Sequence, residues 1–255
     1  MVAEYLIVSD VDGTLLGDDS SLERFRKWLA PRRKRFRLAY NSGRFPVSLR
    51  DSIDRHGLPT PDALIGGVGT QIERFASGEP LEGWPEFSGY WDAQVVRTIL
   101  AKEPHLILQP ERFLSDYKVS YFAKDASEAQ IADWLSRLAG AGLRVRHVYS
   151  SQRDLDFLPA GCDKGTATAF LAARWGFRRD RVITCGDTAN DIAMFAQGFL
   201  SVVVGNALEE VKTLRASTIY HAKASHAEGV QEGIDYWLDQ QPQRVNELAS
   251  NDNRC

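Results

Sequence analysis

Short apolar runs alternate with amphipathic segments over the first 66 residues of the chain. Residues 5–8 and 63–65 are apolar runs of strand length, and residues 36–40 are a third strand candidate between them. Residues 20–30 place apolar side chains three and four positions apart, which is typical of an amphipathic helix, and residues 46–56 are a second helical segment. This β-α-β-α-β order predicts a parallel sheet with right-handed crossovers.

The pattern changes near residue 80. Three segments now alternate polar and apolar residues, and one amphipathic helix lies among them. The strand candidates are residues 118–122, 143–149 and 154–158, and the helix is residues 128–139. Strands with one polar face favour an antiparallel sheet that is covered by helices on its apolar face.

After residue 159 the first pattern resumes, with helices at 166–175 and 192–195 and strands at 181–184 and 200–204. We therefore predict an α/β fold in which a Rossmann-like parallel-sheet core is interrupted by an inserted α+β module. The core takes residues 1–79 and 160–255, and the module takes residues 80–159. The polar composition from Gln240 onward predicts an irregular C-terminal tail.

Charge and hydropathy exclude several classes of protein. The 255 residues include 31 Lys and Arg against 34 Asp and Glu, a net charge of −3, so the chain lacks the basic character of a nucleic-acid-binding domain. The one basic run, residues 32–37, is read as a solvated helix end. Apolar runs stay well below the ~20 residues that span a bilayer, so no membrane segment is predicted.

The cysteine count and the first residues indicate the compartment. Three cysteines are an odd number and are widely spaced, which argues against a disulfide framework and for a reducing environment. The N-terminal segment has no basic region ahead of its apolar stretch, as a signal peptide would have. We expect a cytoplasmic protein.

Two carboxylates follow the first predicted strand, Asp10 and Asp12. At the carboxyl end of a parallel strand they would point into the crevice where open α/β sheets bind ligands. One carboxylate there can attack phosphorus, and the other can protonate a leaving oxygen and later deprotonate water. Taken alone, a surface turn explains this pair equally well.

Polar groups also follow the other core strands. Ser42 can offer a hydroxyl to phosphoryl oxygens, and Lys164 an ammonium that neutralises phosphate and carboxylate. Asp187 and Asp191 are four residues apart and could ligate a hard cation, for which oxygen ligands favour Mg²⁺. Each alone has an ordinary explanation as a helix cap, a solvated lysine or a turn residue. Together, at the ends of successive core strands, they favour one phosphate site.

These segments, in this order, resemble the four motifs of the haloacid dehalogenase superfamily of phosphotransferases. The matching stretches are Asp-Val-Asp-Gly-Thr-Leu-Leu (10–16), Ala-Tyr-Asn-Ser-Gly-Arg (39–44), Asp-Lys-Gly (163–165) and Gly-Asp-Thr-Ala-Asn-Asp (186–191). The resemblance covers nearly the whole chain. It implies that Asp10 is the nucleophile and Asp12 the general acid and base.

The same resemblance assigns the remaining site residues. It implies that the phosphoryl group is bound by Ser42, Gly43, Lys164 and Asn190. It also implies a Mg²⁺ cofactor held by Asp10, Asp187, Asp191 and the backbone carbonyl of Asp12. The inserted module would be the cap that covers the site and selects the substrate.

Finer matches resemble the sucrose-phosphatase group and the related bacterial mannosylfructose-phosphate phosphatases. They lie at residues 38–44, 68–72, 118–121, 150–159 and 224–227. The resemblance implies a sugar phosphate substrate, such as the disaccharide phosphate sucrose 6-phosphate. That group usually has Thr where this chain has Ser42, a change that keeps the hydroxyl.

A disaccharide offers hydroxyl groups and apolar ring faces, so its site requires carboxylates, amides and aromatic rings. The candidate substrate contacts are Arg44, Thr70, Gln71, Lys118, Tyr121, Gln152, Asp154 and Asp156. An aromatic residue at alternating spacing is more often part of a core than of a binding surface. A core role for Tyr121 therefore stays open.

The leading hypothesis is a Mg²⁺-dependent phosphatase that hydrolyses a disaccharide phosphate through an aspartyl-phosphate. A mannosylfructose-phosphate or glucosylglycerate-type phosphatase stays open, as does a phosphomutase, which needs a cationic second phosphate site in the cap from Arg112, Arg144, Arg146 or Arg153. A non-catalytic sensor would lack a catalytic carboxylate, and none is missing. We expect a monomer with a small-molecule substrate. A sugar-phosphate synthase stays open as a partner.

Overall fold

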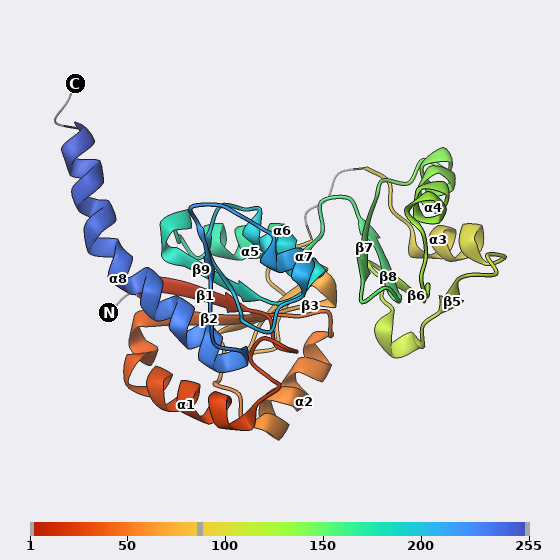
Figure 1. The fold of residues 1–255 in the computed structure, drawn as a ribbon. Coiled ribbons are helices and arrows are strands. Elements are labelled where there is room, and N and C mark those ends of the chain that lie inside the picture. The colour runs from red at the N-terminus through yellow and green to blue at the C-terminus, as the bar shows by residue number, and fades with distance from the viewer. Residues whose placement is uncertain (1–2, 86–88, 253–255) are drawn as a thin grey trace.

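The computed structural model describes residues 3–85 and 89–252, which form a large α/β core and a smaller α+β unit beside it (Figure 1). The core sheet has the strand order β11-β10-β9-β1-β2-β3-β4. Its strands run parallel except β4, which is antiparallel to β3. They are β1 (Tyr5–Ser9), β2 (Phe36–Asn41), β3 (Ala63–Gly66), β4 (Gln71–Arg74), β9 (Val182–Gly186), β10 (Leu200–Val203) and β11 (Ile219–His221). The predicted Rossmann-like parallel sheet is confirmed.

Helices cover both faces of this sheet (Figure 1). On one face α1 (Asp19–Leu29) lies beside α8 (His226–Asp252), and Trp28 Nε1 donates to Asp235 Oδ1 at 3.1 Å. Near α1 on that face lies α2 (Pro46–His56), while α5 (Lys164–Arg174) and α6 (Ile192–Phe195) cover the other. Every residue of β1 is buried between the helical layers, which explains the apolar run over residues 5–8.

Short helical segments make most of the remaining connections in the core. The helix α7 (Glu209–Lys212) lies between β10 and β11. The 3₁₀ helices are η1 (Ala30–Arg35), η2 (Gly67–Gly69), η3 (Glu111–Phe113), η4 (Arg179–Arg181) and η5 (Ala189–Asp191), of which η3 belongs to the smaller unit. The basic run at residues 32–37 lies at η1 and the start of β2, where Arg33 and Arg37 both pair with Asp62. Those two arginines are therefore part of the local packing.

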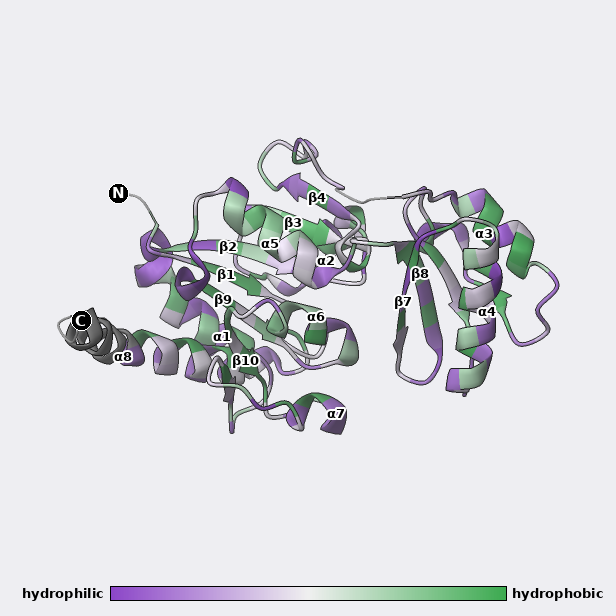
Figure 2. Ribbon diagram, turned by 90° about the horizontal axis from the view of Figure 1, so that it is seen from above, coloured by the Kyte–Doolittle hydropathy of each residue, from purple (hydrophilic) through white to green (hydrophobic). Residues whose placement is uncertain are grey.

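The smaller unit is an antiparallel sheet with helices on one face. Its strands are β5 (Ile107–Leu108), β6 (Val119–Phe122), β7 (Val145–Ser150) and β8 (Asp154–Pro159), in the order β5-β6-β8-β7. The helices α3 (Ala93–Leu100) and α4 (Glu128–Gly140) lie on the far side of this sheet from the core (Figure 2). Ser120 and Asp156 are register partners on the opposite face, which is turned toward the core.

Six elements of the structure were not predicted from the sequence, namely the strands β4, β5 and β11 and the helices α3, α7 and α8. β4, β5, β11 and α7 have four residues or fewer, which is too short for a periodicity to be recognised, whereas α3 has a helical spacing of Val96 and Leu100 that the sequence-based prediction overlooked. The irregular tail predicted from Gln240 is wrong, because α8 continues to Asp252. Its first turns bury Val230, Ile234 and Trp237 against the core, so the helix is anchored well before the polar stretch begins.

Among the helices of the described residues, none combines the length and the apolar character that a bilayer crossing requires.

Candidate active site

The carboxyl ends of three neighbouring strands bring the predicted site residues together. Asp10 follows β1, Ser42 follows β2 and Asp187 follows β9, and these strands are adjacent in the order β9-β1-β2. Parallel strands end at the same edge of a sheet, so residues far apart in the sequence meet there. Lys164, the first residue of α5, lies at the same edge, and its side chain is fully buried.

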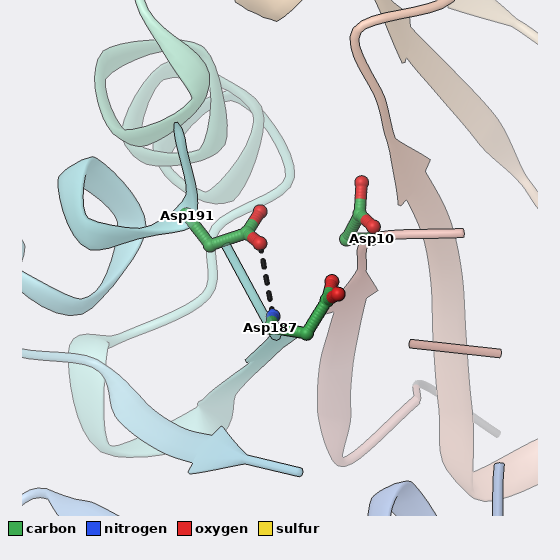
Figure 3. Close-up of side chains that lie close together, drawn as sticks. All are labelled: Asp10, Asp187 and Asp191. Atoms are coloured by element: carbon green, nitrogen blue, oxygen red, sulfur yellow. Dashed lines mark hydrogen bonds between the residues drawn. The ribbon is translucent and has the colours of Figure 1, made fainter. Parts of the chain in front are cut away.

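Three aspartates form one buried cluster at this edge (Figure 3). Carboxylate oxygens of Asp10, Asp187 and Asp191 lie within 4.8 Å of one another. The backbone N–H of Asp187 donates to Asp191 Oδ2 at 3.0 Å. Thr14 donates its hydroxyl to Asp187 Oδ1 at 2.8 Å, which ties the turn after β1 to the cluster.

Lys164 joins two of these carboxylates. Its Nζ donates to Asp10 Oδ1 at 2.6 Å and to Asp191 Oδ1 at 2.7 Å. Asp163 caps α5 through a capping box with Thr166, which fixes the direction in which the lysine leaves the helix. Burial alone would lower the pKa of Lys164, but the carboxylates of Asp10 and Asp191 outweigh burial and raise it. The side chain is therefore an ammonium.

The cluster carries more negative charge than this one ammonium balances. Burial, together with Asp191 and Asp187, raises the pKa of Asp10 well above its usual range, against the opposing effect of Lys164. Burial and the neighbouring Asp191 raise the pKa of Asp187 to about 6. A further cation among these oxygens would relieve the repulsion. An all-oxygen donor set of this size fits a hard divalent ion such as Mg²⁺.

We expect saturating Mg²⁺ to raise the melting temperature more at pH 7.5 than at pH 5.5. A carboxyl group with a raised pKa binds its proton more tightly in the folded chain, so it favours folding at low pH and loses this effect as the pH rises through about 6. Mg²⁺ replaces that proton, and at about 100 times its Kd it adds roughly 2.7 kcal/mol, or very roughly 5–10 °C.

Thermal unfolding with Mg²⁺ or with EDTA measures this shift, and Asp187→Asn is the variant that should lose most of it. An equal shift in the variant, or the same shift at both pH values, would contradict a metal site in this cluster.

The predicted phosphate ligands lie around the same edge. Ser42 is buried, and its Oγ accepts from the backbone N–H of Arg44 at 3.2 Å. Gly43 is half-buried beside it. Asn190 lies in η5 next to Asp191, and its Oδ1 accepts from the Thr188 hydroxyl at 3.0 Å. The structure thus gathers these residues near Asp10, and their role as phosphate ligands stays a prediction.

Asp12 lies apart from the buried cluster. Its side chain is about half exposed, and both of its oxygens accept from Arg44, at 2.7 Å from Nε and 2.6 Å from Nη2. Arg44 also donates from Nη1 to Ser52 Oγ at 2.7 Å. Arg44, expected to contact the substrate, is therefore engaged with the predicted general acid in this conformation.

Four of the predicted substrate contacts lie in or next to strands of the smaller sheet and divide between its two faces. Lys118, Asp154 and Asp156 belong to the face turned toward the core. Lys118 Nζ donates to Ser120 Oγ at 2.5 Å, pairs with Asp156 Oδ1 at 2.9 Å and lies 5.7 Å from the ring centroid of Phe45, a core residue. This places the polar face of the smaller unit over the loop that follows β2.

Tyr121 is not part of that face. It alternates with Ser120 along β6, so its ring points to the helices, is 3% exposed and meets Phe157 edge-on. Burial raises the pKa of its hydroxyl to about 12. Tyr121 therefore belongs to the core of the smaller unit, the alternative that the sequence analysis left open.

The other candidate substrate contacts lie in turns or next to them. Gln152 is exposed at the tip of the β7–β8 hairpin. Thr70 is 1% exposed and donates its hydroxyl to the Gly67 carbonyl at 2.9 Å, while Gln71 begins β4 and is half-buried. Sequence reasoning missed Gln109, which donates to Asp154 Oδ1 at 3.0 Å. Gln109 lies directly after the two-residue strand β5, which is too short to show an alternation that would have indicated it.

The fold and this site together define a protein of the haloacid dehalogenase class, as the sequence motifs implied. Residues 3–238 match the family model described as sucrose-6F-phosphate phosphohydrolase, and the chain belongs to that family.

Individual relatives agree with this placement. The chain is 36% identical over 238 residues to the mannosylfructose-phosphate phosphatase of Agrobacterium fabrum, covering 91% of this chain and 96% of that protein. It is 34% identical to sucrose-phosphatase 1 of Nicotiana tabacum, covering 92% of this chain but 59% of that longer protein. The crystal structure of the Synechocystis sucrose-phosphatase, solved with sucrose and phosphate, superposes with a TM-score of 0.85 at 29% identity, covering 92% and 98% of the two chains.

Proposed function

We propose that the chain is a Mg²⁺-dependent phosphatase that hydrolyses a sugar phosphate, with a disaccharide phosphate such as sucrose 6-phosphate or mannosylfructose phosphate as its substrate. The observation that carries this proposal is the buried Lys164 ammonium between Asp10 and Asp191, at the sheet edge that the polar face of the smaller unit overlies. The names of the relatives support the same reaction class.

Asp10 would begin the reaction as the nucleophile. Lys164 holds its Oδ1, so Oδ2 is the atom that attacks phosphorus. The new P–O bond forms as the bond to the sugar oxygen breaks, and Asp12 donates its proton to that oxygen. Ser42 and the backbone N–H of Gly43 would donate hydrogen bonds to the phosphoryl oxygens.

A water molecule would complete the cycle. Asp12, now a carboxylate, takes a proton from the water as its oxygen attacks phosphorus. The bond to Asp10 breaks, inorganic phosphate leaves, and both carboxyl groups return to their starting states. Mg²⁺, when bound by Asp10, Asp187, Asp191 and the Asp12 carbonyl, would neutralise charge on the phosphoryl oxygens.

To act as the general acid and base, Asp12 has to break its ion pair with Arg44. Both of its oxygens are bound by the guanidinium, so neither is free for the sugar oxygen in this conformation. We infer that substrate binding opens this ion pair and that Arg44 then meets the substrate. Both residues follow core strands and their side chains are nearly half exposed, so rotation of these side chains would open the pair.

We infer further that residues 80–159 act as the cap that selects the sugar. Lys118, Ser120 and Asp156 form a hydrogen-bonded row on the face turned toward the core. Gln109 and Asp154 form a second pair on the same face. Neighbouring donors and acceptors of this kind suit the hydroxyl groups of a sugar.

Lys118→Met is expected to raise KM for a disaccharide phosphate by about tenfold or more, since a hydrogen bond from a charged group contributes roughly 1.5–3 kcal/mol. Turnover of p-nitrophenyl phosphate, which has no sugar, should change little. Steady-state kinetics on both substrates measure the difference, with the exposed Lys124→Met as the matched control. An equal loss of activity on both substrates would show that Lys118 does not help to select the sugar.

Phosphate release with Mg²⁺ from a panel of disaccharide and monosaccharide phosphates tests the substrate class. We expect kcat/KM to be highest for sucrose 6-phosphate or mannosylfructose phosphate. An even spread over monosaccharide phosphates would leave the chemistry in place and contradict the disaccharide assignment. Of the four arginines considered for the second phosphate site of a phosphomutase, Arg146 pairs with Asp163 and Arg153 with Asp154.

A further inference from the structure

The carbonyl of Gly13, in the turn that carries Asp10 and Asp12, is bound by two side chains from distant parts of the sequence. Asn206 Nδ2 donates to Gly13 O at 2.7 Å, and His226 Nδ1 lies 3.0 Å from the same oxygen. A carbonyl only accepts, so His226 Nδ1 carries the proton in this contact. Asn206 Oδ1 in turn accepts from the backbone N–H of His226 at 2.8 Å. We call Asn206 and His226 the Gly13 clamp.

The backbone around the clamp is adapted to it. His226 has a φ of +54°, in the left-handed region that residues other than glycine seldom adopt. Gly17, at φ +136°, passes so close to the imidazole that a Cβ there would lie 2.2 Å from His226 Cε1. A strained residue held against a close-packed turn points to a defined task for its ring.

The turn that the clamp contacts also has hydrogen bonds of its own. Gly13 N–H donates to Leu16 O and Leu15 N–H to Val11 O, both bonds inside the turn. The carbonyl of Gly13 belongs to the peptide that leads to Thr14, whose hydroxyl supports Asp187. Fixing this peptide therefore fixes the residue after Asp12 and one support of the acidic cluster together.

We infer that Asn206 and His226 are positioning residues that hold the catalytic turn against the acidic cluster. They touch neither the side chain of Asp10 nor that of Asp12 in the contacts described, and act through the backbone of Gly13. The inference rests on the proposed function, because the turn matters for turnover only if Asp10 and Asp12 react.

His226→Ala, compared with His226→Asn, separates positioning from packing. Asparagine tolerates a positive φ and places Nδ2 where histidine has Nδ1, so it keeps the hydrogen bond. We expect His226→Ala to lower kcat about tenfold with KM changed less than about threefold, because small misplacements of reacting groups are costly. His226→Asn should recover most of kcat, and Asn206→Ala should resemble His226→Ala.

His221→Ala is the matched control. His221 lies in β11, where its Nε2 contacts the Leu214 carbonyl, and it has no place in the catalytic turn. Turnover is measured with a sugar phosphate and with p-nitrophenyl phosphate, and the Mg²⁺-dependent rise in melting temperature is measured on the same samples. That rise should be smaller in His226→Ala, because the support of Asp187 through Thr14 is loosened.

The inference is overturned if His226→Ala matches His221→Ala in both kcat and Mg²⁺ response. It is also overturned if His226→Asn is as impaired as His226→Ala, since the imidazole would then only fill space. If the wild-type chain hydrolyses neither substrate, the proposed function fails, and the Mg²⁺ response alone decides whether the clamp positions the turn.

Discussion

Asp10→Asn is expected to abolish phosphate release, lowering kcat by about 10⁴-fold or more, as removal of a nucleophile does in other enzymes with a covalent intermediate. The amide has the shape of the carboxylate but is a poor nucleophile. The substitution also removes one negative charge from a buried cluster in which burial, together with repulsion from the other aspartates, raises the pKa of Asp10. The variant should therefore fold as well as the wild-type chain while being inactive.

Initial rates of phosphate release at saturating Mg²⁺ measure this loss, with the melting temperature of the same sample as the check on folding. Asp19→Asn, an exposed carboxylate in the first turn of α1, is the matched control and should retain full activity. Substantial turnover by a folded Asp10→Asn variant would show that another group attacks phosphorus.

Lys164→Met is expected to impair both folding and turnover. The ammonium has no solvent exposure and balances Asp10 and Asp191, so its loss leaves buried carboxylates unpaired. Breaking a buried pair from one side costs roughly 3–5 kcal/mol. Loss of a charged group that stabilises the transition state costs about 10²–10³ in kcat.

The pH dependence of this variant gives the sharper test. Without Lys164, which opposes the rise, the pKa of Asp10 rises further, so the folded chain binds this proton more tightly than the unfolded chain. Its stability should then fall as the pH rises from about 5 to 8, and Mg²⁺ should restore part of it. Urea unfolding at several pH values measures this, with the exposed Lys102→Met as the control. A pH-independent stability equal to that of the control would contradict the charge balance described.

The position of the site could be predicted because each residue is tied to the end of a strand. Asp10, Ser42 and Asp187 follow β1, β2 and β9, and the apolar runs alone predict where these strands end. Parallel strands then bring the three residues to one edge without further information. The chemistry followed from the residue types found at that edge.

Contacts that depend on orientation could not be predicted in this way. Alternation separates Ser120 from Tyr121 but does not say which face meets the helices, so Tyr121 was named as a substrate contact and lies in the core of the smaller unit. The pairing of Asp12 with Arg44 depends on how two loops approach each other. No periodicity encodes that approach.

The contacts of the Gly13 clamp could not be predicted from the sequence either, and they join residues that are far apart along the chain. Asn206 and His226 are 193 and 213 residues from Gly13 along the chain. Only the resemblance of residues 224–227 to the sucrose-phosphatase group gave a hint of His226, and it gave none of its partner. Contacts between loops at one sheet edge become visible only when the sheet order is known.

The stereochemical course at phosphorus tests the central claim most directly. Sucrose 6-phosphate with an isotopically chiral thiophosphoryl group would be hydrolysed with Mg²⁺ in labelled water, and the configuration of the released thiophosphate determined by NMR. Attack by Asp10 followed by attack of water is two in-line displacements, each of which inverts phosphorus, so the account predicts net retention. Net inversion would mean that water attacks the substrate directly, and would contradict an intermediate on Asp10.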